Sequence, residues 1–144
     1  MARVLGIDLG SRRIGLAVSD GLGLTAQPRE TVARHGGARD IASIAAAVKD
    51  CGAERIVLGL PLDPEGAEGP AARRARDFAG KLAAALHLPV ELIDESFSTV
   101  EAEAVLLAAD VSRAKRKQVV DKLAAAVILQ RWLDQQTGTA EEEP

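Results

Sequence analysis

The first acidic side chain of chemical interest lies in a segment that otherwise looks buried. Asp8 follows Val4, Leu5 and Ile7 in a strand-like run. An ionised carboxylate among apolar side chains needs a cation or strong hydrogen-bond donors to offset the loss of water. An aspartate at a strand end can also bond to the following turn, here at Gly10. Asp8 is therefore a candidate site residue, with a role in the turn as the alternative.

Two further acids directly follow a short apolar strand. Asp94 and Glu95 come after residues Val90–Ile93. Because side chains alternate between the faces of a strand, Glu95 is expected on the face of Ile93. Asp94 is expected on the opposite face, with Leu92. One of these acids can then point into a site, and the alternative is a pair of solvated loop carboxylates.

Asp121 interrupts the apolar face of a predicted helix. The positions three, four and seven residues onward lie on the same helical stripe and are Ala124, Ala125 and Ile128. The alternative explanation is an anion near a helix N-terminus, paired with Lys117 four residues earlier. Acids from separate segments, without histidine or cysteine beside them, match the oxygen ligands that Mg²⁺ and Mn²⁺ prefer.

Two clusters of cations are candidates for contact with an anionic partner. The first consists of Arg113, Lys115, Arg116 and Lys117 and is expected to precede the helix of Asp121. We expect it to contact phosphates, although a solvated charge run is the alternative. The second consists of Arg73, Arg74 and Arg76. It is interpreted as the solvated face of a helix and carries no site.

Composition predicts one globular domain. The chain has 144 residues, of which 47% are hydrophobic and 27% charged, with a net charge of -3. We expect a domain over residues 1–136 and a disordered acidic tail over residues 137–144. No apolar run approaches the ~20 residues of a membrane span, and the strand-like start leaves no room for a signal peptide. A cytoplasmic location without membrane contact is therefore expected.

Cysteine and aromatic residues are few. With one cysteine and two histidines the usual zinc ligand sets cannot be assembled, so Cys51 is expected in the core. The chain has no tyrosine, two phenylalanines and one tryptophan, and therefore lacks an aromatic platform for stacking bases. Trp132 is expected in the core. Phe97 is also expected there, with a wedge into opened nucleic acid as the alternative.

Hydrophobic periodicity predicts a hairpin followed by alternating helices and strands. The expected strands cover residues 3–9, 14–18, 25–33, 55–60 and 90–93. The expected helices lie between Gly37 and Gly52, from Pro70 to before Pro89, from Ser98 to about Ala109, and from near Lys117 to about Gln135. Ser98 and Glu101 form a capping-box pattern for the third helix. The fold class is therefore α/β, with a mixed sheet flanked by helices.

Four ordered motifs carry a resemblance to a known family. They are Gly-Ile-Asp-Leu-Gly at 6–10 with Arg-Ile-Gly-Leu-Ala-Val-Ser-Asp at 13–20, Val-Leu-Gly-Leu-Pro-Leu at 57–62 with Gly66 and Gly69, Asp94-Glu95 with Ser98-Thr99, and Lys115-Arg116-Lys117 with Asp121 and the apolar run 124–129. In this order they resemble the bacterial YqgF/RuvX family, a branch of the RNase H-like fold. The likeness spans nearly the whole chain.

The resemblance implies a five-stranded RNase H-like sheet and an endonuclease that trims precursor 16S ribosomal RNA, with Holliday junction resolution as the alternative. Carried over by motif, Asp8, Glu95 and Asp121 become the catalytic ligands of Mg²⁺ or Mn²⁺, with two ions expected. Arg13 and the basic run would bind the nucleic acid, either precursor rRNA or branched DNA. Symmetric junction cutting calls for a homodimer, whereas a monomer suffices for RNA trimming.

The chain departs from the family pattern at Ser96-Phe97, where members commonly carry arginine and leucine. An arginine there can hold the scissile phosphate through paired hydrogen bonds that a serine cannot make. Either Arg13 or the basic run substitutes for it, or the activity is weaker. Asp63-Pro64 also differs from the more usual polar residues of that loop, which leaves substrate preference open.

Two other function classes are compatible with parts of the sequence. Sugar kinases and actin-like ATPases use a glycine-rich hairpin with Asp-x-Gly to cradle nucleotide phosphates, but they close two such domains around ATP and this chain supplies one. A non-catalytic nucleic-acid factor in transcription or ribosome assembly stays open because of Ser96.

Overall fold

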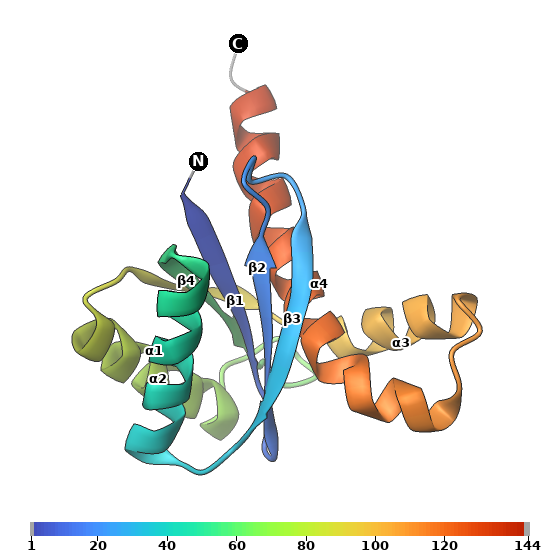
Figure 1. The fold of residues 1–144 in the computed structure, drawn as a ribbon, viewed down its shortest axis with the longest axis horizontal. Coiled ribbons are helices and arrows are strands. Elements are labelled where there is room, and N and C mark those ends of the chain that lie inside the picture. The colour runs from blue at the N-terminus through green and yellow to red at the C-terminus, as the bar shows by residue number, and fades with distance from the viewer. Residues whose placement is uncertain (1, 143–144) are drawn as a thin grey trace.

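Five strands form one mixed sheet at the centre of the molecule (Figure 1). The computed structural model describes the backbone of residues 2–142 and the side chains of residues 2–136. The strands are β1 (Arg3–Leu9), β2 (Arg13–Ser19), β3 (Ala26–Ala33), β4 (Ala53–Leu60) and β5 (Val90–Asp94). Their spatial order is β3-β2-β1-β4-β5. The first three pair antiparallel, and β4 and β5 add to β1 in parallel, so the expected mixed sheet is confirmed.

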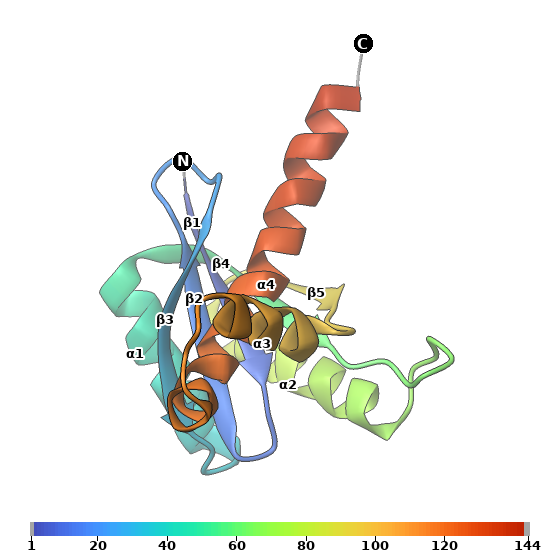
Figure 2. The same cartoon turned by 90° about the vertical axis from the view of Figure 1, so that its right-hand side faces the viewer.

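Helices cover both faces of the sheet. They are α1 (Gly37–Cys51), α2 (Pro70–Leu86), α3 (Ser98–Ala108) and α4 (Arg113–Glu142). Figures 1 and 2 show α1 and α2 on one side of the sheet and α4 on the other, with α3 packed against α4. Among the described residues, no helix is long and apolar enough to cross a membrane.

Strand alternation divides the apolar side chains between two clusters. Leu5 and Ile7 of β1 pack with Leu58 of β4 on the side of α1 and α2, where Cys51 is also buried. Val4 and Val57 instead join a second cluster on the side of α4. Trp132 is partly buried against this second cluster, and Arg55 stands 5.8 Å over its ring. The core positions expected for Cys51 and Trp132 agree with this packing.

Local signals place most helix boundaries correctly. Gly52 ends α1 in the left-handed conformation (φ 72°) and donates its N–H to the Val48 carbonyl at 2.8 Å. Pro70 opens α2, where its missing N–H leaves no donor unsatisfied. The sequence therefore carries the information for these two helices in single residues at their ends.

The capping box expected at the start of α3 is wrong. The residue before the helix is Phe97, in the left-handed conformation (φ 64°), and no side chain caps the helix. Ser98 is already the first helical residue and is buried, and its N–H bonds to the Glu95 carbonyl at 3.0 Å. The tight turn after Glu95 thus replaces the cap.

The last helix is longer than expected at both ends. It begins at Arg113 rather than near Lys117, because Ser112 caps it: the Ser112 Oγ accepts the Lys115 N–H at 3.4 Å. It extends to Glu142, so residues 137–142 continue a helix where a disordered tail was expected. Residues 143–144 of the expected tail lie outside the described residues.

Candidate active site

Asp8 lies near the end of β1, on the face of the sheet that α4 covers. It pairs across the strands with Gly15 of β2 and is only 8% exposed. Gly6, two residues earlier, faces the same helix, since a Cβ placed there would lie 2.7 Å from Cβ of Leu129. The strand pattern that made Asp8 conspicuous is therefore confirmed: this carboxyl group is buried on the face that α4 covers.

Gly15 allows α4 to lie directly on the hairpin. A Cβ at Gly15 would stand 2.0 Å from the backbone oxygen of Asp121, closer than real contacts allow. Because Gly15 is the strand partner of Asp8, the same close approach carries Asp121 to Asp8. The glycine of the hairpin motif is thus a positioning residue for the helix.

Glu95 reaches the same place from β5. Its backbone N–H bonds to the Leu60 carbonyl at 3.2 Å, which fixes the chain just beyond β5 beside the end of β4. A Cβ at Gly59 would lie 2.9 Å from the Glu95 Oε1, so the side chain folds over this glycine. Glu95 thereby shares a hydrogen bond with Asp8. The expected face of Glu95 is correct, and Asp94 instead accepts the Ser96 N–H and hydroxyl at 2.9 and 2.6 Å.

Burial and mutual repulsion hold protons on this pair. Burial raises the pKa of Asp8 to about 6, with the Asp121 charge adding to it and the bond from Glu95 opposing it. Burial raises the pKa of Glu95 to about 7, helped by the charge and hydrogen bond of Asp8. Near neutral pH the Glu95 hydroxyl therefore donates to the Asp8 carboxylate.

Asp121 forms an ion pair with a strand residue. The Arg13 Nε donates to the Asp121 Oδ2 at 2.6 Å, and the two side chains are 51% and 22% exposed. Arg13 precedes Gly15 by two residues and so shares its face of β2. The sequence offered Lys117 as an alternative partner for Asp121. This expectation is wrong, because α4 lies against the hairpin and brings Arg13 closer.

The donor set of this cluster suits a hard divalent cation. Its ligands are carboxylate oxygens. Two of the acids, Asp8 and Glu95, have raised pKa values, which a bound cation would lower again. As the side chains stand, no group of three or more ligating side chains among the described residues is arranged around a common ion. Asp121 is turned towards Arg13, so it must exchange this arginine for the ion to complete the set.

The segment after Glu95 differs from its expected packing. Phe97 is 75% exposed, so the core position expected for it is wrong. The turn that begins α3 points its side chain outwards, two residues from Glu95. Arg131 of α4 fixes this segment by donating to the Asp94 carbonyl at 3.1 Å and to Glu101 at 2.8 Å.

The basic run 113–117 forms the first turns of α4 rather than a loop before it. At a rise of about 1.5 Å per residue, its cations lie roughly 6–12 Å along the helix from Asp121. Arg113, Lys115 and Lys117 are exposed. Arg116 is half-buried and donates to the Val111 carbonyl at 2.8 Å, so it holds the turn between α3 and α4.

The cluster of Arg73, Arg74 and Arg76 divides into separate roles. Arg76 forms a two-bond ion pair with Glu68 at 2.5 and 2.7 Å. Arg74 lines a cavity together with Glu95, which the interpretation as a solvated face missed. Only the fold reveals this, because α2 and Glu95 meet through the packing of β4 and β5.

Comparison with known sequences connects the whole arrangement to one family. The family model described as RuvX: Holliday junction resolvase matches residues 2–135. A Myxococcus xanthus protein named "Putative pre-16S rRNA nuclease" is 52% identical over 132 residues, which cover 92% of this chain and 87% of that protein. A protein of the same name from Anaeromyxobacter dehalogenans is 54% identical, over 92% of this chain and 96% of that protein. The resemblance inferred from the motifs is confirmed.

Solved structures with a similar fold include two Holliday junction enzymes bound to DNA. RuvC of T. thermophilus in complex with Holliday junction substrate has a TM-score of 0.57 at 18% identity, covering 96% of this chain and 98% of that one. The Fowlpox virus resolvase with Holliday junction DNA has a TM-score of 0.60 at 10% identity, covering 93% and 98%. The expected RNase H-like fold is confirmed by this likeness.

Proposed function

The chain belongs to the family described as RuvX: Holliday junction resolvase, and we propose that it is a nuclease that depends on divalent metal ions. The observation that carries the proposal is the cluster of Asp8, Glu95 and Asp121 from three distant segments. Close packing at Gly15 and Gly59 builds this cluster, and burial leaves two of its acids with raised pKa values. A cluster of like charges of this kind is stabilised by a cation.

The three acids and Arg13 would have different roles in the reaction. Asp8, Glu95 and Asp121 would hold Mg²⁺ or Mn²⁺, which when bound activates water for attack on phosphorus and stabilises the leaving oxygen, with two ions expected. Glu95 must lose its proton to become a ligand, so metal binding releases a proton. Arg13, once Asp121 turns away from it, is placed to donate to a phosphate oxygen. It thereby substitutes for the family arginine that Ser96 replaces.

The preferred substrate in this proposal is precursor 16S ribosomal RNA. The relatives that share about half of their residues with this chain carry that substrate in their name. Such an enzyme would work in the cytoplasm. Junction DNA is the second candidate, favoured by the family description and by the two DNA-bound structures of similar fold. A homodimer would be required for symmetric junction cutting, whereas a monomer can trim RNA.

The direct test is cleavage of matched substrates. Precursor 16S rRNA, single-stranded DNA and four-way junction DNA are incubated with the protein in Mg²⁺, in Mn²⁺ and in excess EDTA. We expect RNA cleavage that requires the metal, with Mn²⁺ at least as effective as Mg²⁺ because it accepts a less ideal set of oxygens. If junction DNA is cleaved in preference to RNA, it would take the place of precursor rRNA as the proposed substrate. Metal binding without any cleavage would favour the non-catalytic factor, and full activity in EDTA would remove the metal mechanism.

A further inference from the structure

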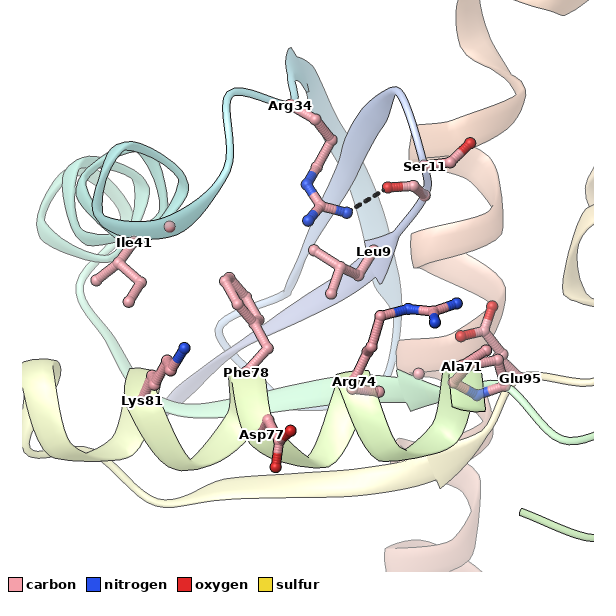
Figure 3. Close-up of a pocket in the computed structure, with 15 residues that line it drawn as sticks. Leu9, Ser11, Arg34, Ile41, Ala71, Arg74, Asp77, Phe78, Lys81 and Glu95 are labelled. Atoms are coloured by element: carbon pink, nitrogen blue, oxygen red, sulfur yellow. Dashed lines mark hydrogen bonds between the residues drawn. The ribbon is translucent and has the colours of Figure 1, made fainter. Parts of the chain in front are cut away.

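A cavity of about 510 Å³ opens beside the carboxylate cluster (Figure 3). It lies between α1, α2 and the ends of β1 and β4, and it shares Glu95 and Gly59 with the candidate active site. Its volume falls within the range of about 300–1,000 Å³ that small-ligand sites occupy. A group bound here would therefore continue directly into the site where the phosphodiester is cut.

One cation of this cavity is held in place before any ligand arrives. The Arg34 Nε donates to the Asp40 Oδ2 at 2.8 Å, and its Nη1 donates to the Gly10 carbonyl at 2.6 Å. Asp40 has no exposed surface and also accepts the N–H groups of His35 and Gly36. Figure 3 shows the Arg34 guanidinium facing the cavity. A cation fixed in this way loses little conformational entropy when it binds an anion.

Two further cations enter the cavity from α2. Arg74 and Lys81 lie on one stripe of this helix with Phe78 between them, next to the side that packs in the core, against which Phe78 is itself partly buried. Neither cation forms an ion pair with another residue in the described part of the chain. The lining has two acids, Asp77 and Glu95, against the three cations, and Arg34 is already paired with Asp40. The cations that stay free for a ligand are therefore those of α2.

The lining also has an apolar part suited to a sugar or base. Leu9, Ile41 and Phe78 line the cavity, and Figure 3 shows the Phe78 ring directed into it. Cations beside an aromatic ring match a nucleotide, whose phosphate is anionic and whose base has a flat apolar face. Inorganic phosphate would leave this apolar part unused.

We propose that this cavity holds a nucleotide of the substrate strand next to the scissile phosphate, with Arg34 and Arg74 binding its phosphate and Phe78 contacting its sugar or base. The proposal rests on the nuclease function, because a strand crossing the carboxylate cluster passes Glu95 and Gly59 into the cavity. Lys81 would bind the next phosphate along. The arginines of α2 thus have unequal roles despite their adjacent positions.

The test compares Arg74→Ala with Arg73→Ala. Both side chains are exposed and stand side by side on α2, and of the two only Arg74 lines the cavity. Binding of a short single-stranded RNA is measured by fluorescence anisotropy in EDTA at several salt concentrations, so no cleavage is needed. We expect Arg74→Ala to weaken binding roughly tenfold and to lower the salt slope by about 0.7. Arg73→Ala should change binding less than twofold, and Lys81→Ala should act like Arg74→Ala.

Photo-crosslinking locates the bound strand in the same complex. RNA carrying 4-thiouridine should crosslink to the α2 peptide that contains Phe78, and Arg74→Ala should reduce this product. Equal affinities for Arg73→Ala and Arg74→Ala would overturn the proposal, as would crosslinks confined to other elements. Binding of AMP that depends on Arg74 but does not compete with RNA would also overturn it, by making the cavity a small-ligand site. Binding and crosslinking are measured without metal. Their outcome therefore does not depend on whether the protein cleaves RNA in the cleavage test.

Discussion

The two faces of the sheet are built from different kinds of side chain. The face under α1 and α2 is filled by large residues without exposed surface, namely Leu5, Ile7, Ile14, Leu16, Ile56 and Leu58. The face under α4 has glycine where the helix and Glu95 come closest, at Gly6, Gly15 and Gly59. The first face therefore gains free energy from apolar burial. The face under α4 has little side-chain volume at these glycines, and this allows a helix backbone and three acids to come into contact.

This difference shows where stability and function separate in the molecule. The close approach of α4 removes water from Asp8 and brings like charges together, which is unfavourable for folding. Sites of this kind are tolerated when the surrounding structure over-determines them. Changes at the glycines and acids of the α4 face should then act on chemistry, and changes in the large apolar side chains of the opposite face should act on stability.

The largest effect is expected from the acids themselves. Asp8→Asn, Glu95→Gln and Asp121→Asn each remove a ligand charge with little change of shape, so cleavage should fall at least about 100-fold in each while the fold is kept. Rates of substrate cleavage and circular dichroism spectra provide the measurement. Glu103→Gln on the exposed side of α3 is the matched control and should keep full activity. Near-normal cleavage by one of the three variants would remove that residue from the triad.

Neighbouring residues of β2 provide the next comparison. Gly15→Ala places a methyl group against the Asp121 backbone, so α4 must shift, and cleavage should fall on the order of 100-fold. Leu16→Ala empties space on the other face and should lower the free energy of unfolding by about 2–5 kcal/mol. The folded fraction of Leu16→Ala should cleave within a few-fold of wild type.

Urea unfolding and single-turnover cleavage measure both effects. Gly21→Ala is the control for a glycine with open space around it and should change neither. The account of the two faces fails if Gly15→Ala retains activity, or if Leu16→Ala loses activity without losing stability.

The pH dependence of stability should show the repulsion on the α4 face. In the folded state the pKa values of Asp8 and Glu95 are raised to about 6 and about 7, so the folded protein holds more protons than the unfolded chain between pH 4 and 7. This contribution to stability is complete below about pH 4 and is lost as the pH rises through 6 and 7. Without metal, the melting temperature should therefore decrease by a few degrees from pH 5 to pH 8.

Glu95→Gln identifies the source of this decrease. The variant cannot ionise at position 95, so its melting temperature should fall less than that of wild type over the same interval in EDTA. Thermal unfolding at pH 5, 6, 7 and 8 measures the difference between the two proteins. The same pH dependence in both would place the proton-linked instability elsewhere.

The smallest effect is expected from the start of α4. Arg113→Ala, Lys115→Ala and Lys117→Ala combined leave Arg116 and its bond to the Val111 carbonyl intact. RNA of different sequences should bind more weakly by similar factors, and the salt slope should fall by roughly 0.7–0.9 for each lost phosphate contact. Anisotropy titrations at several salt concentrations measure this, with Arg39→Ala and Lys49→Ala on α1 as the control. An unchanged slope would make the run a solvated charge cluster.

Local patterns in the sequence predict the elements and the faces of the acids. The alternation through Val4, Leu5 and Ile7 predicts that Asp8 is buried, and the position of Ile93 predicts the face of Glu95. Gly52 and Pro70 mark helix ends by their own conformational preferences. Each of these signals acts over a few residues, and each is visible in the sequence alone.

Contacts between distant segments could not be predicted in the same way. Arg13 and Asp121 are 108 residues apart, and their ion pair exists because α4 lies on Gly15. Phe97 was expected in the core from its type alone, whereas the turn after Glu95 directs it outwards. Arg74 looked like a solvated cation because its neighbours in the cavity come from other elements.

Binding of Mn²⁺ to the protein without nucleic acid tests the central claim most directly. Isothermal titration calorimetry of wild type at pH 6.5, where Glu95 is mostly protonated, should show saturable binding with release of protons, because Glu95 must ionise. Asp8→Asn, Glu95→Gln and Asp121→Asn should each lose this binding, and Glu103→Gln should keep it. Equal Mn²⁺ affinity in wild type and in the three triad variants would contradict the account, since the acids brought together under α4 would then not be a metal site.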